Sequence, residues 1–336
     1  MDNAMDNAMD MNILVLGGTS FVGRAIVEDA LRGGARVTLF GRGRTGTGLF
    51  PGLTRIVGDR DTGDYAALRD GRWDAVVDVS GYVPRHVGQA MDALGDRVGR
   101  YLFISSHAVY DNTGLRPGSD EDTPRRPPER DTEVLDNTTY GPCKVACEDD
   151  VLARYGTRAT IVRPGKVAGP YDPSDTFTHW VRRAARGGRV ALPTDPAQPV
   201  RIVDSRDLAR LVGRLLADDR PGAFHAVGPA EPTTLGGLIR TCARVAGTRV
   251  EIVPVTVAPD ELPPLFPLLR PDRPSQQRSP ARARAAGLPA TPLEVTAADV
   301  LAWDRARGLP AIRRGFSPGQ ERELLARHDG PARASG

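Results

Sequence analysis

The sequence predicts an α/β fold: a doubly wound, Rossmann-type parallel sheet with a smaller C-terminal substrate-binding subdomain. Short apolar runs alternate with stretches of helical periodicity over the first half of the chain, which is typical of βαβ units. The first run leads into a glycine-rich turn, GGTSFVG, at residues 17–23. After Gly169 the alternation loosens into short segments, and residues 254–280 are rich in proline. The second part of the chain is therefore expected to be less regular.

The predicted elements follow in chain order. Residues 12–16 (NILVL) form an apolar run of the kind found in buried parallel strands. The apolar side chains of residues 26, 27, 30 and 31 share one helical face, and Gly33 ends that helix. Further strands are predicted at 36–40, 54–59, 74–80, 100–106 and 159–165, and further helices near 140–148, 180–186, 207–216, 295–303 and 319–328. Residues 112–130, rich in Pro and charge, are expected to form a loop over the carboxyl edge of the sheet.

Composition excludes several functional classes. The 45 Lys plus Arg and 42 Asp plus Glu give a net charge of +3, too small for a dedicated binder of nucleic acid. No apolar run approaches the roughly 20 residues of a membrane span. Three cysteines, with no paired framework, favour a reducing cytoplasm. Cys143 and Cys147 share a helix face, but no further ligands accompany them, so no metal site is expected.

The glycine turn predicts a dinucleotide site. A strand, a turn of small residues and then a helix let the backbone approach a pyrophosphate, and the helix N-terminus supplies free N–H groups. A second strand about 20 residues on completes the pattern. The residues expected to contact the cofactor here are Gly17, Gly18, Thr19, Ser20, Phe21, Val22 and Gly23.

The end of the second strand indicates which dinucleotide. An NAD site normally places an acid there for the ribose 2′-hydroxyl. This strand ends LFGRGRT, with Arg42 and Arg44 and no acid, and arginine binds a 2′-phosphate bidentately. NADP is therefore predicted. The alternatives are NAD and a merely solvated basic loop.

The chain contains two lysines, Lys144 and Lys166, among 45 − 2 = 43 arginines. Tyr140 lies four residues before Lys144, so on a helix the two side chains share a face. An ammonium group beside a phenol lowers the pKa of the phenol toward the range useful for proton transfer. The same ammonium can bond a nicotinamide ribose as a compact donor, which a planar guanidinium does not.

These motifs, GGTSFVG, FISSHAVY and YGPCK, resemble the extended short-chain dehydrogenase/reductase superfamily, of the NAD(P)-dependent epimerase/dehydratase type. The resemblance covers roughly residues 11–216. It implies that Tyr140 is the acid/base, Lys144 its partner and Ser106 the hydroxyl that orients the substrate oxygen. It adds as cofactor contacts Asp59, Arg60, Ser80, Gly81, Pro164 and Val167. A narrower likeness, through GGTSFVG, RPGKVAGPYDPSDTFTHWVRRAARGG and VDSRDLA, is to the atypical group that includes chloroplast stem-loop RNA-binding proteins.

The sequence also departs from the superfamily pattern. Ser20 stands where the turn usually has glycine, and Lys166 stands where asparagine is common. His107 and Ala108 replace the Asp-Glu pair of the sugar 4,6-dehydratases, which argues against that elimination. The arginine that binds a substrate diphosphate in nucleotide-sugar enzymes aligns with Val200, one residue before Arg201.

The expected domains are a disordered extension (1–10), an NAD(P)-binding Rossmann domain (11–168) and a mostly substrate-binding subdomain (169–330), from which about 200–216 return to the Rossmann sheet. The expected substrate contacts are Tyr82, His107, Lys166, Tyr171, His179, Trp180 and Arg183. For His179 a packing role is the competing interpretation, and for Lys166 a plain surface charge.

The predicted function is an NADP-dependent oxidoreductase that transfers hydride to or from a carbonyl or alcohol of a small, sugar-like or secondary-metabolite substrate. One alternative is a sugar epimerase that retains NAD. Another, of a different class, is a cofactor-binding regulator or RNA-binding protein, against which the intact set of Ser106, Tyr140 and Lys144 argues. A small-molecule partner is expected, without nucleic acid or membrane, in the cytoplasm, and a homodimer is left open.

Overall fold

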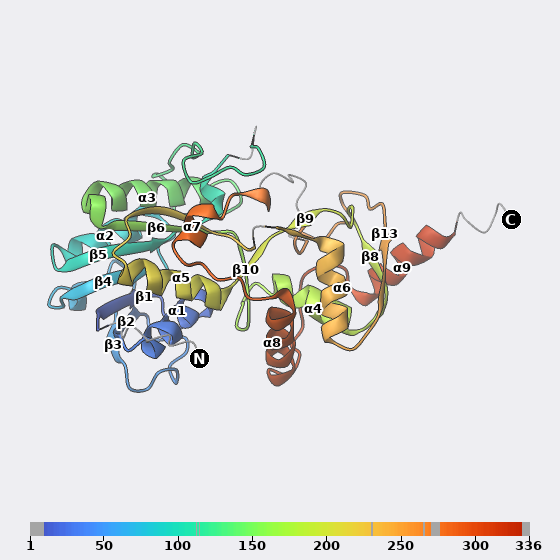
Figure 1. Cartoon of the computed structure of the whole chain (residues 1–336), viewed down its shortest axis with the longest axis horizontal. Coiled ribbons are helices and arrows are strands. Elements are labelled where there is room, and N and C mark those ends of the chain that lie inside the picture. Colours follow the sequence, from blue (N-terminus) through green and yellow to red (C-terminus); the bar gives the residue numbers. More distant parts are fainter. Residues whose placement is uncertain are drawn as a thin grey trace.

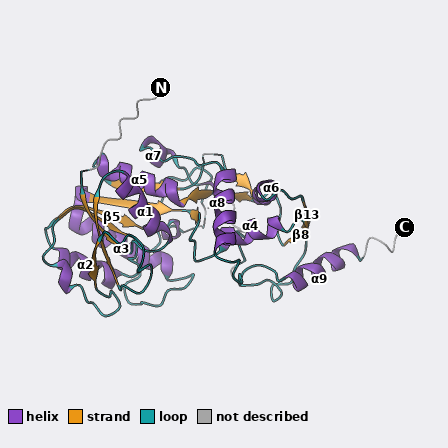
Figure 2. Cartoon of the chain, turned by 90° about the horizontal axis from the view of Figure 1, so that it is seen from below, coloured by secondary structure: helices purple, strands orange, loops and turns teal. Residues whose placement is uncertain are grey.

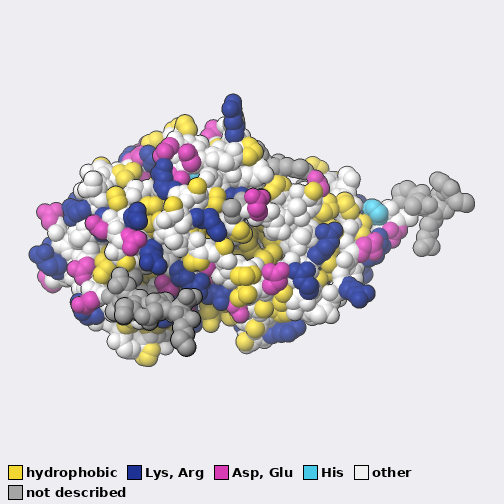
Figure 3. All heavy atoms as spheres, in the orientation of Figure 1, with side chains coloured by type: hydrophobic (Ala, Val, Ile, Leu, Met, Phe, Trp, Pro, Cys, Tyr) yellow, Lys and Arg dark blue, Asp and Glu magenta, His cyan; other side chains and the backbone are white. Residues whose placement is uncertain are grey.

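A computed structural model of the 336-residue chain describes residues 10–111, 113, 115–229, 231–264, 266–269 and 276–330. The predicted disordered extension therefore lies outside the described residues, apart from Asp10. None of the helices in these ranges is long and apolar enough to cross a bilayer. On the face shown in Figure 3, basic and acidic side chains are interspersed, as the small net charge suggests.

A seven-stranded parallel sheet forms the first lobe (Figure 1). Its strands are β1 (Asn12–Leu16), β2 (Arg36–Gly41), β3 (Thr54–Val57), β4 (Trp73–Asp78), β5 (Val98–Ile104), β6 (Ala159–Pro164) and β11 (Gly222–Ala226). In the order β11-β6-β5-β4-β1-β2-β3, the chain first adds β2 and β3 on one side of β1 and then adds β4, β5, β6 and β11 on the other side. The switch point therefore lies between β1 and β4. In a doubly wound sheet, such a switch point opens a crevice at the carboxyl ends of the strands. The predicted fold class is confirmed.

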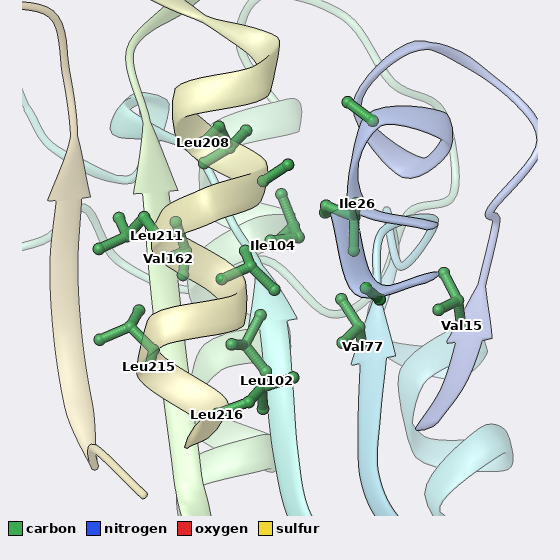
Figure 4. Packing of buried hydrophobic residues seen from close by; sticks show 14 of the residues in the cluster. Val15, Ile26, Val77, Leu102, Ile104, Val162, Leu208, Leu211, Leu215 and Leu216 are labelled. Atoms are coloured by element: carbon green, nitrogen blue, oxygen red, sulfur yellow. The ribbon is translucent and has the colours of Figure 1, made fainter. Parts of the chain in front are cut away.

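Two pairs of helices cover the sheet. On one face, α1 (Phe21–Arg32) packs beside α5 (Ser205–Ala217), and on the other, α2 (Pro84–Leu94) packs beside α3 (Tyr140–Tyr155). Figure 4 shows Leu208 and Leu211 of α5 against Val162 and Ile104 of the strands, all fully or almost fully buried. The alternation of apolar strands with amphipathic helices in the sequence produces these two cores, one on each face.

The second lobe holds small sheets and helices around its own core (Figure 2). Its strand pairs are β7 (Lys166–Ala168) with β10 (Ile202–Asp204), β8 (Gly188–Leu192) with β13 (Val250–Pro254), and β9 (Pro199–Val200) with β12 (Thr233–Thr234). Its helices are α4 (Thr176–Ala185), α6 (Leu235–Val245), α8 (Leu293–Ala306) and α9 (Pro318–Asp329). Short α7 (Ala281–Ala285) returns to the first lobe beside β11, and the 3₁₀ turns are η1 (Ala66–Leu68), η2 (His107–Val109) and η3 (Gly156–Arg158).

Two details differ from the sequence-based expectation. The strand expected near residue 200 to rejoin the main sheet instead pairs outside it, as β10 with β7, although the helix after it, α5, does pack on α1. The seventh strand of the main sheet is β11 (GAFHA), which pairs with β6. Its five residues, flanked by Pro and Gly, carry too little periodicity to be recognised as a strand without the sheet edge that it completes.

Candidate active site

A cavity of about 550 Å³ opens at the carboxyl ends of the parallel strands. Its walls come from the glycine turn after β1, the ends of β2 to β6 and the start of α3. Most of the predicted cofactor and catalytic residues line it: Gly17, Thr19, Ser20, Phe21, Val22, Arg42, Arg44, Asp59, Arg60, Ser80, Ser106, Tyr140, Lys144, Pro164 and Val167.

The glycines of the turn are required by close packing. Gly17 has φ +93°, and a Cβ there would lie 2.8 Å from Cβ of Ser80. A Cβ on Gly23, in the first turn of α1, would lie 2.0 Å from the backbone oxygen of Gly17. A Cβ on Gly18 would meet Leu39 at 2.7 Å, inside the core. Gly18 and Gly23 are thus required by packing on the side of the turn away from the cavity, while Gly17 and residues 19–22 line the cavity at the N-terminus of α1, which fits a pyrophosphate.

The basic side chains after β2 lie on the rim of the cavity. Nη1 of Arg42 is 3.2 Å from Oδ2 of Asp61, and Nη2 of Arg44 is 3.8 Å from Oδ2 of Asp59. Both guanidinium groups are largely exposed. Arg55, on β3, also lines the cavity and donates to the carbonyl oxygens of Gly46 and Leu49 in the loop after β2.

Arg60 differs from its neighbours because its side chain turns inward. Its guanidinium is almost fully buried and pairs with Asp78 at 2.7 Å, and the other carboxylate oxygen of Asp78 accepts the Tyr101 hydroxyl at 2.7 Å. Arg60 was predicted as a cofactor contact, and it does line the cavity, but its guanidinium forms an internal ion pair with Asp78 at the end of β4.

The predicted catalytic residues lie together at one end of the cavity. Ser106 ends the segment after β5 and caps η2, accepting from the Ala108 N–H at 3.1 Å. Tyr140, the first residue of α3, lines the cavity beside it. Burial raises the pKa of the Tyr140 phenol, and the neighbouring Ser106 hydroxyl opposes that rise.

Lys144 does not act on Tyr140 as the spacing predicts. Its Nζ donates to the carbonyl oxygens of Gly81 and Ile104, at 2.7 Å each, from an almost fully buried position. Burial lowers the pKa of Lys144 to about 8. The prediction that the ammonium lowers the pKa of the phenol is wrong for this structure, because the lysine stem runs inward between the loop after β4 and the end of β5, while the phenol turns to Ser106.

Of the predicted substrate residues, Tyr82 lines the cavity, while His107, Lys166 and Tyr171 lie outside its lining. Tyr82 is 45% exposed and lines it directly. His107 lies behind the wall: a Cβ on Gly165 would be 3.9 Å from its Nδ1. Lys166 lies between the cavity-lining residues 165 and 167, with its Nζ 3.4 Å from Oγ of Ser174. Tyr171 is 42% exposed and stacks under the guanidinium of Arg24, 3.6 Å from the ring centroid.

The other three, His179, Trp180 and Arg183, lie outside the cavity lining, which corrects the prediction. Trp180 is 1% exposed and donates from Nε1 to the Pro267 oxygen at 3.0 Å. Arg183 pairs with Glu321 of α9 at 2.7 Å. The ring of His179 packs on Trp180, and burial, with the neighbouring Arg186, lowers its pKa to about 4. The apolar face of α4 is turned into the second lobe's core, so these side chains stabilise that lobe.

Some lining residues escaped the sequence-based interpretation. His86 of α2 and Asp61 line the cavity near the rim arginines, with Nε2 of His86 3.8 Å from Oδ1 of Asp61. Ile104 lines it beside the catalytic end. No motif marks His86 or Ile104, while Asp61 stands two residues after Asp59 in VGDRD, which was a usable signal. Among the described residues, no group of three or more His, Cys, Asp or Glu could hold a metal ion.

Comparisons with known proteins agree with this geometry. The sequence model described as "NAD dependent epimerase/dehydratase family" matches residues 13–227. The chain is 24% identical over 254 residues to the chloroplast stem-loop binding protein of 41 kDa b of Arabidopsis thaliana, and the alignment covers 71% of this chain and 64% of that protein. The chain thus spans less than two thirds of the length of this relative.

Solved structures share the fold. The Bordetella bronchiseptica enzyme WbmH in complex with NAD+ is 23% identical with a TM-score of 0.66, covering 89% of this chain and 99% of that one. RMD from Pseudomonas aeruginosa, complexed with NADPH, is 20% identical with a TM-score of 0.63, also covering 89% and 99%. At these identities the likeness concerns the fold alone.

Proposed function

The chain belongs to the NAD-dependent epimerase/dehydratase family, and from this premise we propose that it is an NADP-dependent oxidoreductase acting on a small carbonyl or alcohol substrate. The observation that carries the proposal is that Ser106, Tyr140 and Lys144 line one end of a cavity whose other parts suit a dinucleotide. A regulator that only sensed the cofactor would not need such a set.

The chain's own residues divide the work as follows. A nicotinamide dinucleotide, when bound, supplies or accepts the hydride. Ser106 orients the substrate oxygen, and Tyr140 exchanges a proton with it. The Tyr140 phenol would protonate the alkoxide that develops in carbonyl reduction, and its phenolate would take the proton back when an alcohol is oxidised.

The proposed preference for NADP is supported by the rim after β2. No acid follows this strand, and Arg42 and Arg44 are exposed at the cavity. Each guanidinium faces an aspartate, so a 2′-phosphate would replace one anion by another with more negative charge. Asp59 and the backbone of residue 60 would lie beside the adenine, and Ser80, Gly81, Pro164 and Val167 toward the nicotinamide. As in the sequence-based prediction, NAD is the alternative.

On the substrate side we place Tyr82, His107, Lys166 and Tyr171. Tyr82 offers an exposed aromatic face, and Lys166 a cation held by Ser174 close to the cavity wall. These residues suit a small molecule with an apolar or ring part beside an oxygen-bearing group. The sequence-based alternatives, a sugar epimerase and an RNA-binding protein, are tested together with the reductase.

The experiment starts from NADPH oxidation with a panel of aldehydes, ketones and keto sugars. Tyr140→Phe is expected to lower turnover by at least ~10²-fold, as for a lost general acid, with NADPH binding nearly intact. Tyr155→Phe is the matched control, because it removes a hydroxyl from the last residue of the same helix, away from the cavity. Equal activity of the Tyr140 variant and the wild type would remove Tyr140 from the mechanism.

The alternatives give different results in the same preparation. An epimerase would carry NAD through purification, seen by native mass spectrometry, and would convert its substrate without net cofactor turnover. The Arabidopsis relative is named for stem-loop binding, so a mobility-shift assay with a stem-loop RNA is the third arm. RNA binding that persists in Tyr140→Phe, without any NADPH-dependent turnover, would favour the RNA-binding alternative.

A further inference from the structure

Arg85, the second residue of α2, joins two segments that are far apart in sequence. Its guanidinium forms a bidentate ion pair with Glu133, in which Nη2 lies 2.8 Å from Oε2. It also donates to the carbonyl oxygens of Arg60 and Asp61, at 3.3 Å each. The same group reaches Gln89 Oε1 at 3.3 Å within its own helix.

The carbonyls on one side of Arg85 belong to the loop that follows β3. That loop lines the cavity with Asp59, Arg60 and Asp61, and it is closed by paired backbone hydrogen bonds between Asp59 and Asp64. The Asp61 side chain contacts Arg42 on the opposite rim. A dinucleotide whose adenosine end lay here would therefore hold this loop, and with it the two carbonyls that Arg85 bonds.

The carboxylate on the other side belongs to the segment that ends at Tyr140. From Glu133 onward this segment is a tightly bonded turn. The Thr139 hydroxyl donates to the Val134 oxygen at 2.6 Å, and Asp136 accepts from the Thr138 and Thr139 N–H groups at 2.7 and 3.0 Å. The Tyr140 N–H then donates to the Asp136 oxygen at 3.1 Å. Glu133 immediately precedes this bonded turn, and the turn leads directly into the start of α3.

We propose that Arg85 is a positioning residue: it links the adenosine side of the cofactor site to the segment 133–139, so that cofactor binding orders Tyr140. The inference rests on the proposed function, and it assigns a role that the sequence motifs leave unassigned. The planar fork of arginine explains the residue type, because a lysine ammonium cannot hold a bidentate carboxylate and two carbonyls at once. Both partners are partly exposed, at 35% and 51%, so the pair contributes little to stability and its effect is positional.

A second ion pair, made by a residue just before the segment 133–139, provides the control. Arg130 lies three residues before Glu133 and pairs with Asp150 of α3 at 2.8 Å. It anchors the segment to the helix without any hydrogen bond to the loop after β3. Arg130→Ala therefore removes an exposed ion pair of the same kind while leaving the link through Arg85 intact.

The test compares Arg85→Ala, Arg85→Lys, Glu133→Gln and Arg130→Ala in the full chain. Hydrogen exchange of residues 131–139 is measured with and without NADPH, together with the NADPH dissociation constant and kcat. In the wild type and in Arg130→Ala, NADPH is expected to slow exchange in this segment. In Arg85→Ala and Glu133→Gln this protection is expected to disappear, with kcat lower by about 10- to 100-fold, the range for misplaced catalytic groups.

Glu133→Gln keeps the loop after β3 unchanged, so its NADPH dissociation constant is expected to stay within about twofold of wild type, the effect falling on kcat. Persistent protection of 131–139 in both Arg85→Ala and Glu133→Gln would overturn the inference, as would equal loss of protection in Arg130→Ala. Tyr140→Phe tests the two proposals by separate readouts. Loss of turnover supports the proposed function, and retained NADPH-dependent protection of residues 131–139 supports the role of Arg85. Absence of binding by NADPH and NADH alike would overturn both.

Discussion

At the scale of single residues, the two lysines of the chain have different surroundings. Lys144 is buried and holds the carbonyls of Gly81 and Ile104, two positions 63 and 40 residues away in sequence. A guanidinium has no room for this compact contact, which explains why lysine stands here in an arginine-rich chain. Lys166 stays near the cavity wall beside Ser174. Lys144 thus connects the loop after β4 to the end of β5 at the catalytic end of the cavity, and Lys166 is a candidate substrate contact.

Arg42, on the rim of the cavity, is the residue whose removal should distinguish NADPH from NADH binding. Arg42→Ala is expected to weaken NADPH binding by about 1.5–3 kcal/mol, the range for a hydrogen bond to a charged group, and to leave NADH binding nearly unchanged. The loss follows because Asp61, now 3.2 Å from Arg42, would face the 2′-phosphate without its counter-ion. Titration of cofactor fluorescence measures both affinities.

Arg36→Ala is the matched control, since Arg36 is an exposed arginine at the other end of β2 and pairs with Asp10. It should leave both affinities unchanged. An equal loss for NADPH and NADH in Arg42→Ala would show that Arg42 does not contact the 2′-phosphate, and NADP would no longer be the predicted cofactor.

At the scale of elements, the junction of β1 and α1 depends on Gly23. Alanine normally stabilises a helix relative to glycine, by roughly 0.5–1 kcal/mol. At Gly23 the added Cβ would lie 2.0 Å from the Gly17 oxygen, so the turn has to open. Gly23→Ala is expected to lower the affinity for NADPH by at least about tenfold, the effect of 1.4 kcal/mol, and to lower the melting temperature.

Gly88 of α2 is the internal comparison, because a Cβ there would meet nothing within 4 Å. Gly88→Ala is expected to keep full cofactor affinity and to melt at the same or a higher temperature. If Gly23→Ala bound NADPH as tightly as Gly88→Ala, the close approach of α1 to the turn would not be what shapes the cofactor site.

At the scale of the whole molecule, the second lobe has a core of its own, and the partly buried His179 packs against two of its members, Trp180 and Phe266. Burial lowers the pKa of His179 to about 4, from an ordinary value of 6.5. Between these pH values the unfolded chain binds a proton that the folded chain does not, so stability falls as the pH is lowered from 6.5 to 4. For this one group the loss amounts to at most about 3 kcal/mol.

His179→Asn is therefore expected to flatten the dependence of the free energy of unfolding on pH in this window by up to one proton, measured by urea titration at several pH values. His225, with its pKa lowered to about 3 by burial, shares the window and keeps part of the slope in the variant. An unchanged slope in His179→Asn would mean that His179 is protonated within the folded protein.

Local patterns in the sequence determined much of this protein. Alternating apolar runs predicted six of the seven main-sheet strands, because burial on both faces demands continuous apolar residues. The turn GGTSFVG predicted the dinucleotide crevice, since only small residues permit the close approach seen at Gly17 and Gly23. The spacing of Tyr140 and Lys144 placed both on one helix, and resemblance added Ser106, which lines the same cavity.

Tertiary structure decided what those patterns leave open. Periodicity shows which face of α4 is apolar but not which core it meets. His179, Trp180 and Arg183 were therefore predicted as substrate contacts, whereas Trp180 and Arg183 are buried in the second lobe and His179 packs on Trp180. The direction of the Lys144 ammonium and the bridge from Arg85 to Glu133 join residues 40 to 63 positions apart. Such contacts depend on how packed elements bring distant backbone and side chains together, and no local spacing in the chain encodes them.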